Sequence, residues 1–167
     1  MEPDWIDRVV ERWSELQPGL PVDAYHVTGR ISRIAARIAQ REDEIFGRYG
    51  LTRGDVGVLG ALQTSPPPHT LSPTQLFRGL MMSSAGMTKR LDRLEQLGLV
   101  QRNPDKTDRR GVTIHLTERG RRLLARAVAE NTKSEALLLA GLNGRDRRVL
   151  GDLLRTVLSG AEPAAGG

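Results

Sequence analysis

The chain has 167 residues, 38% of them hydrophobic and none of them cysteine, so it can bury a core within one folding unit but cannot form disulfides, thiolate metal sites or a cysteine nucleophile. Its net charge of +5 is a modest indication of a polyanionic partner, because many soluble proteins are mildly basic. No apolar run approaches the ~20 residues that span a bilayer, and the acidic, helical start is unlike a signal peptide, so we predict a cytoplasmic protein with no membrane association.

Apolar residues at helical spacing predict two helices before residue 50. The first begins at Asp4 and ends at the proline–glycine break at 18–19. The second is longer and runs from about Val22 to Arg48 with one apolar stripe. Its length is typical of a scaffold or dimerisation helix.

Three shorter helices follow, and each begins at a polar residue that can cap it. In the first two, a second polar residue three positions later completes a capping box, which satisfies two free backbone donors at once. The caps are Thr52 with Asp55, Ser72 with Gln75, and Ser83 or Ser84. The third helix places apolar residues inward at helical spacing and ends at Gly98.

After Gly98 the periodicity changes from helical to alternating. Leu99 and Val100 begin a strand, residues 103–106 have turn chemistry, and residues 112–116 alternate as a returning strand. This pattern predicts a two-stranded hairpin with a charged tip.

Two carboxyl-terminal helices complete the pattern, the first capped by Thr117 and the second begun by Asn143. We therefore predict a mainly α fold with a small β-hairpin wing, in which a winged helix-turn-helix is flanked by helices for dimerisation. The predicted boundaries are 1–50 for the amino-terminal dimerisation helices, 51–116 for the winged helix-turn-helix, 117–160 for the carboxyl-terminal dimerisation helices and 161–167 for a disordered tail.

This arrangement of short helices and a basic hairpin fits duplex DNA. A helix fills the major groove, where hydroxyl and cationic side chains can bind base edges, and arginine at a hairpin tip can enter the minor groove. Between Ser83 and Arg126, eleven cations stand against five anions, a net charge of +6 that accounts for the positive charge of the whole chain. The candidate DNA-binding residues of the helix are Ser83, Ser84, Thr88, Lys89, Arg90 and Arg93. The alternative for each cation is an ordinary solvated helix residue.

Within this region the chain resembles the MarR family of multiple-antibiotic-resistance-type regulators, over about Val22 to Leu158. The resemblance is carried by LDRLEQLGLVQR at 91–102, DRR at 108–110 and LTERG at 116–120. It implies that Asp108 and Arg110 belong to the wing and that the arginine reaches the minor groove, with Lys106 and Arg109 as further candidate DNA contacts of the hairpin. The residues themselves also allow Asp108 to orient an arginine, or to form a salt bridge internal to the fold.

The resemblance also implies a homodimer with interleaved terminal helices, which would bind double-stranded DNA at an inverted repeat. Separately, the apolar stripes on the second and last predicted helices are wider than a small winged helix can cover, which favours burial between two subunits.

Some relatives contact an aromatic acid at positions that match Thr88 and Arg102, and Trp13, Arg90 and Arg102 match three ligand-associated positions of the urate-responsive subgroup. Where that subgroup has an aspartate, this chain has Gly57, and Asp55 is predicted to lie on another face. The resemblance therefore implies a small anionic aromatic effector rather than urate itself. The alternative places Trp13 in the core and Arg102 in a salt bridge at the base of the wing.

Neither a metal site nor an active site is predicted. His26, His69 and His115 lie in three different elements, and no nucleophile motif or phosphate-binding loop occurs. We predict no cofactor and no enzymatic activity. The predicted function is a transcriptional regulator, a repressor released by the effector. The alternatives are a constitutive DNA-binding protein without a ligand, and a winged-helix module that binds another protein.

Overall fold

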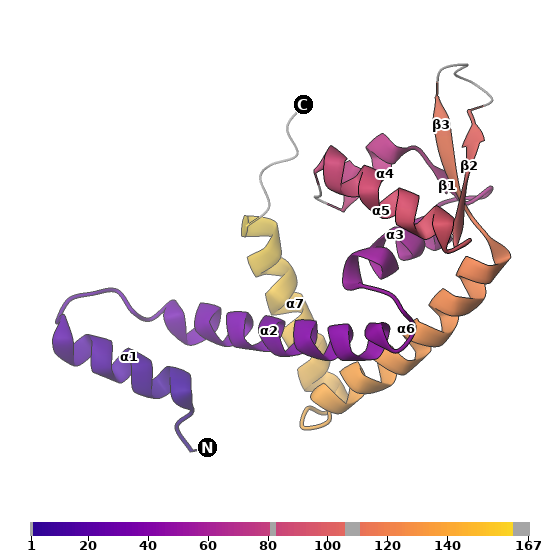
Figure 1. The fold of residues 1–167 in the computed structure, drawn as a ribbon. Coiled ribbons are helices and arrows are strands. Elements are labelled where there is room, and N and C mark those ends of the chain that lie inside the picture. The colour runs from indigo at the N-terminus through magenta and orange to yellow at the C-terminus, as the bar shows by residue number, and fades with distance from the viewer. Residues whose placement is uncertain (1, 81–82, 106–110, 162–167) are drawn as a thin grey trace. The chain divides into compact units, whose positions relative to one another are not determined.

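The computed structural model describes residues 2–80, 83–105 and 111–161. The chain divides into two units, Met1–Val128 and Ala129–Gly167. The first unit contains the three described strands and the helices from α1 to the first half of α6, and the second contains the rest of α6 and α7 (Figure 1). The predicted mainly helical fold with a small wing is confirmed. Within the described ranges, no helix combines the length and the apolarity needed to cross a membrane.

The two predicted amino-terminal helices are α1 (Trp5–Leu16) and α2 (Tyr25–Gly47). Asp4 caps α1, and Asp7 completes a capping box that brings two backbone donors to side-chain oxygens. Helix α2 begins three residues later than predicted. Its N-cap residue, Ala24, supplies no side-chain hydrogen bond, so no local signal marks this start.

Helix α1 packs on the amino-terminal half of α2 through a small apolar contact. Ile6 of α1 is 1% exposed. A Cβ atom added to Gly29 of α2 would lie 2.8 Å from Ile6 Cδ1 and 3.2 Å from the ring of Tyr25. The glycine therefore allows the close approach of the two helices.

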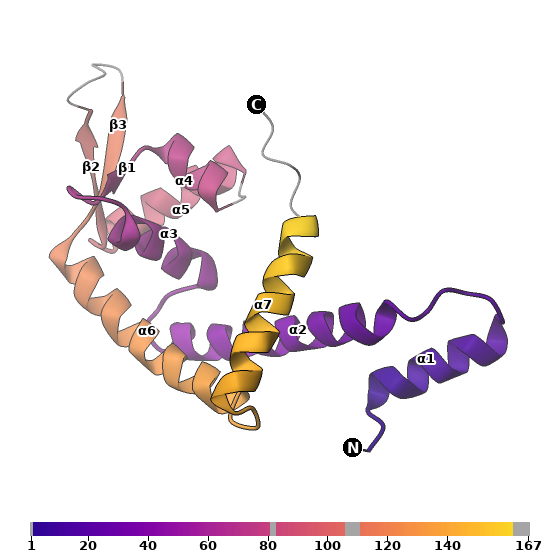
Figure 2. The ribbon, with the colours of Figure 1, turned by 180° about the vertical axis from the view of Figure 1, so that it is seen from behind.

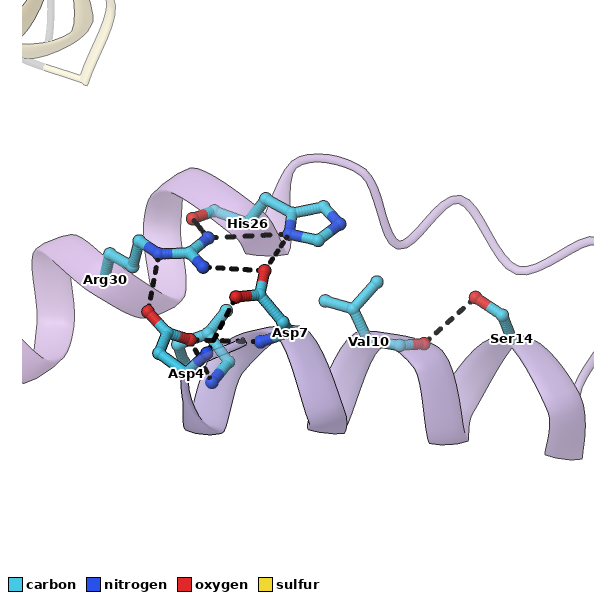
Figure 3. A network of polar contacts seen from close by, with 7 residues as sticks. Asp4, Asp7, Val10, Ser14, His26 and Arg30 are labelled. Atoms are coloured by element: carbon cyan, nitrogen blue, oxygen red, sulfur yellow. Dashed lines mark hydrogen bonds and ion pairs between the residues drawn. The ribbon is translucent and has the colours of Figure 1, made fainter. Parts of the chain in front are cut away.

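An ionic cluster joins the same two helices (Figure 3). Arg30 of α2 donates from Nε to Asp4 Oδ2 at 2.9 Å and from Nη2 to Asp7 Oδ1 at 2.7 Å. The hydrogen bond from Arg30, followed by one from the backbone of Asp4, lowers the pKa of Asp7. Burial acts to raise the pKa of Asp4, but hydrogen bonds from the backbone of Asp7 and Ile6 and from Arg30 outweigh it, so the pKa of Asp4 is also lowered. His26 lies beside them, with Nδ1 at 3.4 Å from Asp7 Oδ1.

These shifts predict that acid weakens the docking of α1 on α2. Because the folded-state pKa values of Asp4 and Asp7 lie below the ordinary value of 3.8, their contribution is present above that pH and is lost as the pH falls through the lowered values. The chain has two tryptophans, Trp5 and Trp13, and both lie in α1, so tryptophan emission reports this helix alone. We expect an emission change below about pH 3.8.

The matched control for this titration is Arg30→Gln, which removes the cation from both carboxylates. Its emission at neutral pH is expected to resemble that of the wild type in acid, with a smaller acid step. Equal acid midpoints for the two proteins would contradict the assignment of the step to this cluster.

The core of the first unit is built from three short helices, the end of α2, the sheet and the first part of α6. The helices are α3 (Arg53–Thr64), α4 (Pro73–Gly79) and α5 (Ser84–Gln96). They begin at Thr52, Ser72 and Ser83, as the capping residues predict. Their buried side chains include Val58, Leu59, Leu62, Leu76, Met87, Leu91 and Leu94.

Three antiparallel strands form one sheet in the order β1-β3-β2, with bounds Thr70–Leu71 (β1), Val100–Pro104 (β2) and Val112–Leu116 (β3). The predicted hairpin is β2 and β3, which extends away from α3 (Figure 2). The sequence did not predict β1. This strand pairs Thr70 with His115 and Leu71 with Ile114.

The last two helices are α6 (Glu118–Leu138) and α7 (Gly144–Ala161). Thr117 Oγ1 accepts the backbone N–H of Gly120 at 3.0 Å, and Asn143 Oδ1 accepts those of Arg145 and Asp146 at 2.9 and 3.0 Å, so both predicted caps are confirmed. No residue of α7 is buried. Its exposed apolar side chains are Val149, Leu150, Leu153, Leu154, Val157 and Leu158. The predicted disordered tail lies outside the described residues from residue 162 onward.

Candidate nucleic-acid interface

Helices α4 and α5 form the predicted helix-turn-helix, and α5 is its second helix. One face of α5 is buried through Met87, Leu91 and Leu94. These side chains belong to the main core, so the opposite face of α5 is held outward by apolar packing.

The outward face carries short polar groups and one lysine. Ser84, Thr88 and Lys89 are exposed. Thr88 Oγ1 donates to the carbonyl oxygen of Ser84 at 3.1 Å, which leaves its lone pairs free to accept. Ser83 Oγ accepts the backbone N–H of Gly86 at 3.2 Å and is thereby engaged in the helix cap. An open hollow on this face is lined by Ala85, Thr88, Lys89, Asp92, Arg93 and Gln96.

The two arginines of α5 bind another element. Arg90 Nη1 donates to Asp55 Oδ1 at 2.9 Å, and Arg93 Nη1 donates to Asp55 Oδ2 at 2.5 Å. Arg90 was predicted to face outward, but its side chain is only 23% exposed. Its Nε atom is buried and has no hydrogen-bond partner among the residues that the structure describes. Asp55 was predicted to lie on another face of its helix from Gly57. Asp55 is buried against Arg90 and Arg93, whereas a Cβ atom at Gly57 would contact Leu80.

Arg102 connects the base of the wing to α5. From β2 its guanidinium donates through Nη2 to Asp92 Oδ1 at 2.6 Å and through Nη1 to Glu95 Oε2 at 2.7 Å. Burial acts to lower the pKa of Arg102, but the hydrogen bonds to Asp92 and Glu95 outweigh it, so the pKa is raised. This is the salt bridge at the wing base that the sequence allowed as the alternative to a ligand contact.

The tip of the wing was predicted to carry Lys106, Asp108, Arg109 and Arg110, and these four residues lie outside the described residues. The ladder between β2 and β3 ends with Pro104 opposite Val112. Beyond it, the backbone N–H of Asp105 donates to the carbonyl oxygen of Gly111 at 2.9 Å.

The four predicted ligand residues, Trp13, Thr88, Arg90 and Arg102, lie in three elements. Trp13 is 45% exposed on α1, which packs against the amino-terminal half of α2, whereas α5 lies toward the opposite end of α2 in both ribbon views (Figures 1 and 2). The structure therefore does not bring Trp13 to Thr88 and Arg90 within one chain. In the described ranges, no group of three or more His, Asp or Glu side chains could hold a metal ion.

Comparisons with known proteins agree with this architecture. The family model described as MarR family matches residues 49–111. The transcriptional regulator PecS of Dickeya dadantii is 34% identical over 152 residues, which cover 91% of this chain and 92% of PecS. The transcriptional repressor NicR of Pseudomonas putida is 29% identical, over 84% of this chain and 89% of NicR.

Solved structures show the same fold. The MarR family regulator AbsC of Streptomyces coelicolor matches with a TM-score of 0.72 at 22% identity, over 83% of this chain and 95% of AbsC. The regulator BldR of Sulfolobus solfataricus matches with a TM-score of 0.68 at 23% identity, over 83% of this chain and 96% of BldR.

Proposed function

The chain belongs to the MarR family of DNA-binding transcriptional regulators, and on this premise we propose that it is a repressor that binds an inverted-repeat operator as a homodimer. The observation that supports operator reading is the outward face of α5. There, hydroxyl and ammonium groups stand on a helix whose other face is buried. A helix of this kind fits the major groove, where such groups bind base edges and phosphates.

On this proposal, α5 and the wing have separate roles. Ser84 and Thr88 read base edges in the major groove, Lys89 neutralises a phosphate beside the groove, and the N-terminus of α5 at Ser83 approaches a phosphate. In the wing, Arg110 enters the minor groove, oriented by Asp108, while Lys106 and Arg109 bind phosphates.

Selection of bound sequences from a random duplex pool tests whether the operator is an inverted repeat. Two half-sites with centres about 34–36 Å apart are expected for a dimer that places two copies of α5 in successive major grooves.

Lys89→Ala is expected to weaken operator binding by about 1–3 kcal/mol and to flatten its salt dependence, because removing one phosphate contact lowers the slope of log K against log salt by ~0.9. Binding titrations at several salt concentrations measure both effects. The control is Arg12→Ala, which removes a cation from an exposed pair with Glu15 on α1 and should leave binding unchanged.

Wild-type affinity that does not depend on salt would contradict the DNA-binding role. It would favour the alternative of a module that binds another protein, since phosphate contacts make affinity fall steeply with salt.

We further propose that a small aromatic carboxylate releases the protein from DNA by competing for Arg102. Asp92 and Glu95 already hold this guanidinium and join α5 to β2, so an anion that replaces either carboxylate loosens the connection between the two reading elements. Such a ligand shifts DNA affinity only if it binds the DNA-incompetent arrangement more tightly, and DNA must then weaken the ligand by the same factor. Thr88 and Arg90 are the other proposed ligand residues of the same chain, and Trp13 is proposed to reach the site from the partner subunit of the homodimer, because α1 lies away from α5 within one chain.

A thermal-shift screen of aromatic acids is the first test, because a bound ligand raises the melting temperature. The active acid is expected to release wild-type protein from its operator with a coupling of ~1–3 kcal/mol. Arg102→Ala lacks the same connection between α5 and β2, so it should bind DNA more weakly than the wild type and lose most of the response to the acid. Trp13→Phe should weaken the ligand moderately. An Arg102→Ala protein that responds like wild type would exclude this site, and the absence of any stabilising acid would favour constitutive DNA binding.

A further inference from the structure

Asp55 is a buried carboxylate that ties the start of α3 to α5. Its side chain is 1% exposed, and Oδ2 accepts the backbone N–H of Thr52 at 2.8 Å as part of the capping box. Its oxygens also accept from Arg90 and Arg93, one on each oxygen. A buried charge is tolerated only when it is paired and hydrogen-bonded, so the two arginines of α5 are structural partners of this carboxylate.

Residues near Asp55 accept further hydrogen bonds from both guanidinium groups. Arg90 Nη1 also donates to Thr52 Oγ1 at 2.7 Å, and Arg93 Nη2 donates to the carbonyl oxygen of Gly50 at 2.8 Å. A Cβ atom at Gly54 would lie closer than 3.0 Å to three atoms of the Arg90 guanidinium, so a larger residue at position 54 would displace this group from its present place. Residues 50–55 thus form a cradle for two arginines that are three residues apart on α5.

Together with the core packing of Met87, Leu91 and Leu94, the bonds to these arginines fix how α5 is rotated about its axis. Successive residues of an α-helix are about 100° apart, so the direction of Arg90 determines where Thr88 and Lys89 point. Both of those residues are exposed, whereas Arg90 is 23% exposed. A guanidinium already bound to a carboxylate is also a weaker partner for phosphate, because the carboxylate compensates its charge.

We propose that Asp55 is a positioning residue for DNA recognition. It holds Arg90 and Arg93 so that Thr88 and Lys89 face the major groove, and it withholds both arginines from the phosphates. This inference rests on the proposed DNA-binding function, and it assigns Arg90 and Arg93 a role different from the direct DNA contact expected from the sequence.

The test compares three variants with the wild type on the selected operator and on a scrambled duplex across a range of salt. Arg93→Met should leave the salt slope unchanged and lower the ratio of specific to non-specific affinity about tenfold, the size of one mismatched base pair. Lys89→Met should flatten the slope by ~0.9 for each phosphate that the lysine neutralises. Asp55→Asn retains a capping oxygen but frees both guanidinium groups, so it should lower the same ratio and steepen the slope.

Two results would overturn the proposal. One is a slope for Arg93→Met that flattens as much as that of Lys89→Met, since Arg93 would then be a phosphate contact. The other is an Asp55→Asn protein that melts earlier but keeps the wild-type ratio and slope, as a purely structural residue would. If Asp55→Asn does not fold, Arg93→Met decides alone. The side chain of Arg93 is 44% exposed and Arg90 still pairs with Asp55 in this variant, so Arg93→Met should fold. Failure of the wild type to bind DNA would instead overturn the proposed function, and the inference with it.

Discussion

Replacing Leu153 and Leu154 of α7 with aspartate is expected to leave the protein monomeric or insoluble and to weaken operator binding by roughly 10²–10⁴-fold. The two leucines are 61% and 42% exposed in the single chain, on a helix in which no residue is buried. In the proposed homodimer this face is buried against the partner, and an unpaired buried carboxylate costs several kcal/mol. A monomer then binds one half-site at a time and loses the advantage of linked binding.

Sedimentation velocity measures the dimer, and titration with the full operator and with a half-site measures the linkage. The control is Thr156→Asp combined with Ser159→Asp, which adds the same charge to polar positions of α7 and should remain dimeric. A double-leucine variant with the mass and operator affinity of the wild type would show that α7 is not the interface.

The helix starts of this fold, except that of α2, could be read from the sequence because their signals are local. Asp4, Thr52 and Ser72 each form a capping box with a residue three positions later, and the structure contains all three boxes. The wing hairpin could also be read from the sequence, because the apolar periodicity changes from helical to alternating directly after Gly98. This glycine has a φ of 68°, the left-handed conformation that ends α5.

Elements that depend on distant partners could not be read in this way. The strand β1 has two residues, and its pairing with His115 and Ile114 lies more than forty positions away along the chain. Propensity and periodicity describe neighbours in sequence, so they carry no information about this pairing.

The candidate site shows the same limit. Arg90 and Arg93 have the spacing of solvated helix cations, and their partner Asp55 lies 35 and 38 residues away. One feature of the sequence does indicate that Asp55 needs a cationic partner. Asp55 is three and four positions before Val58 and Leu59, so it falls on the buried face of α3, where a carboxylate requires a cation.

Gly120→Ala is expected to destabilise the protein by about 3 kcal/mol or more, at the upper end of the range for overpacking. Gly120 is the third residue of α6, and a Cβ atom there would overlap the carbonyl oxygen of Leu99 and lie 2.9 Å from Leu116 Cδ1. The carbonyl cannot move away freely, because it accepts the backbone N–H and the hydroxyl of Thr117, each at 3.1 Å. The added methyl group would therefore separate α6 from the junction between α5 and β2.

The matched control is Gly60→Ala in α3, where an added Cβ atom has no neighbour within 4 Å. Alanine is a better helix residue than glycine, so this change should stabilise the protein by about 0.5–1 kcal/mol. Thermal and urea unfolding should thus move in opposite directions for the two variants, by about 2–4 °C of Tm for each kcal/mol. A Gly120→Ala protein that melts with the wild type would show that α6 can shift at its start, and that the wing base is less tightly packed than the contact at Leu99 implies.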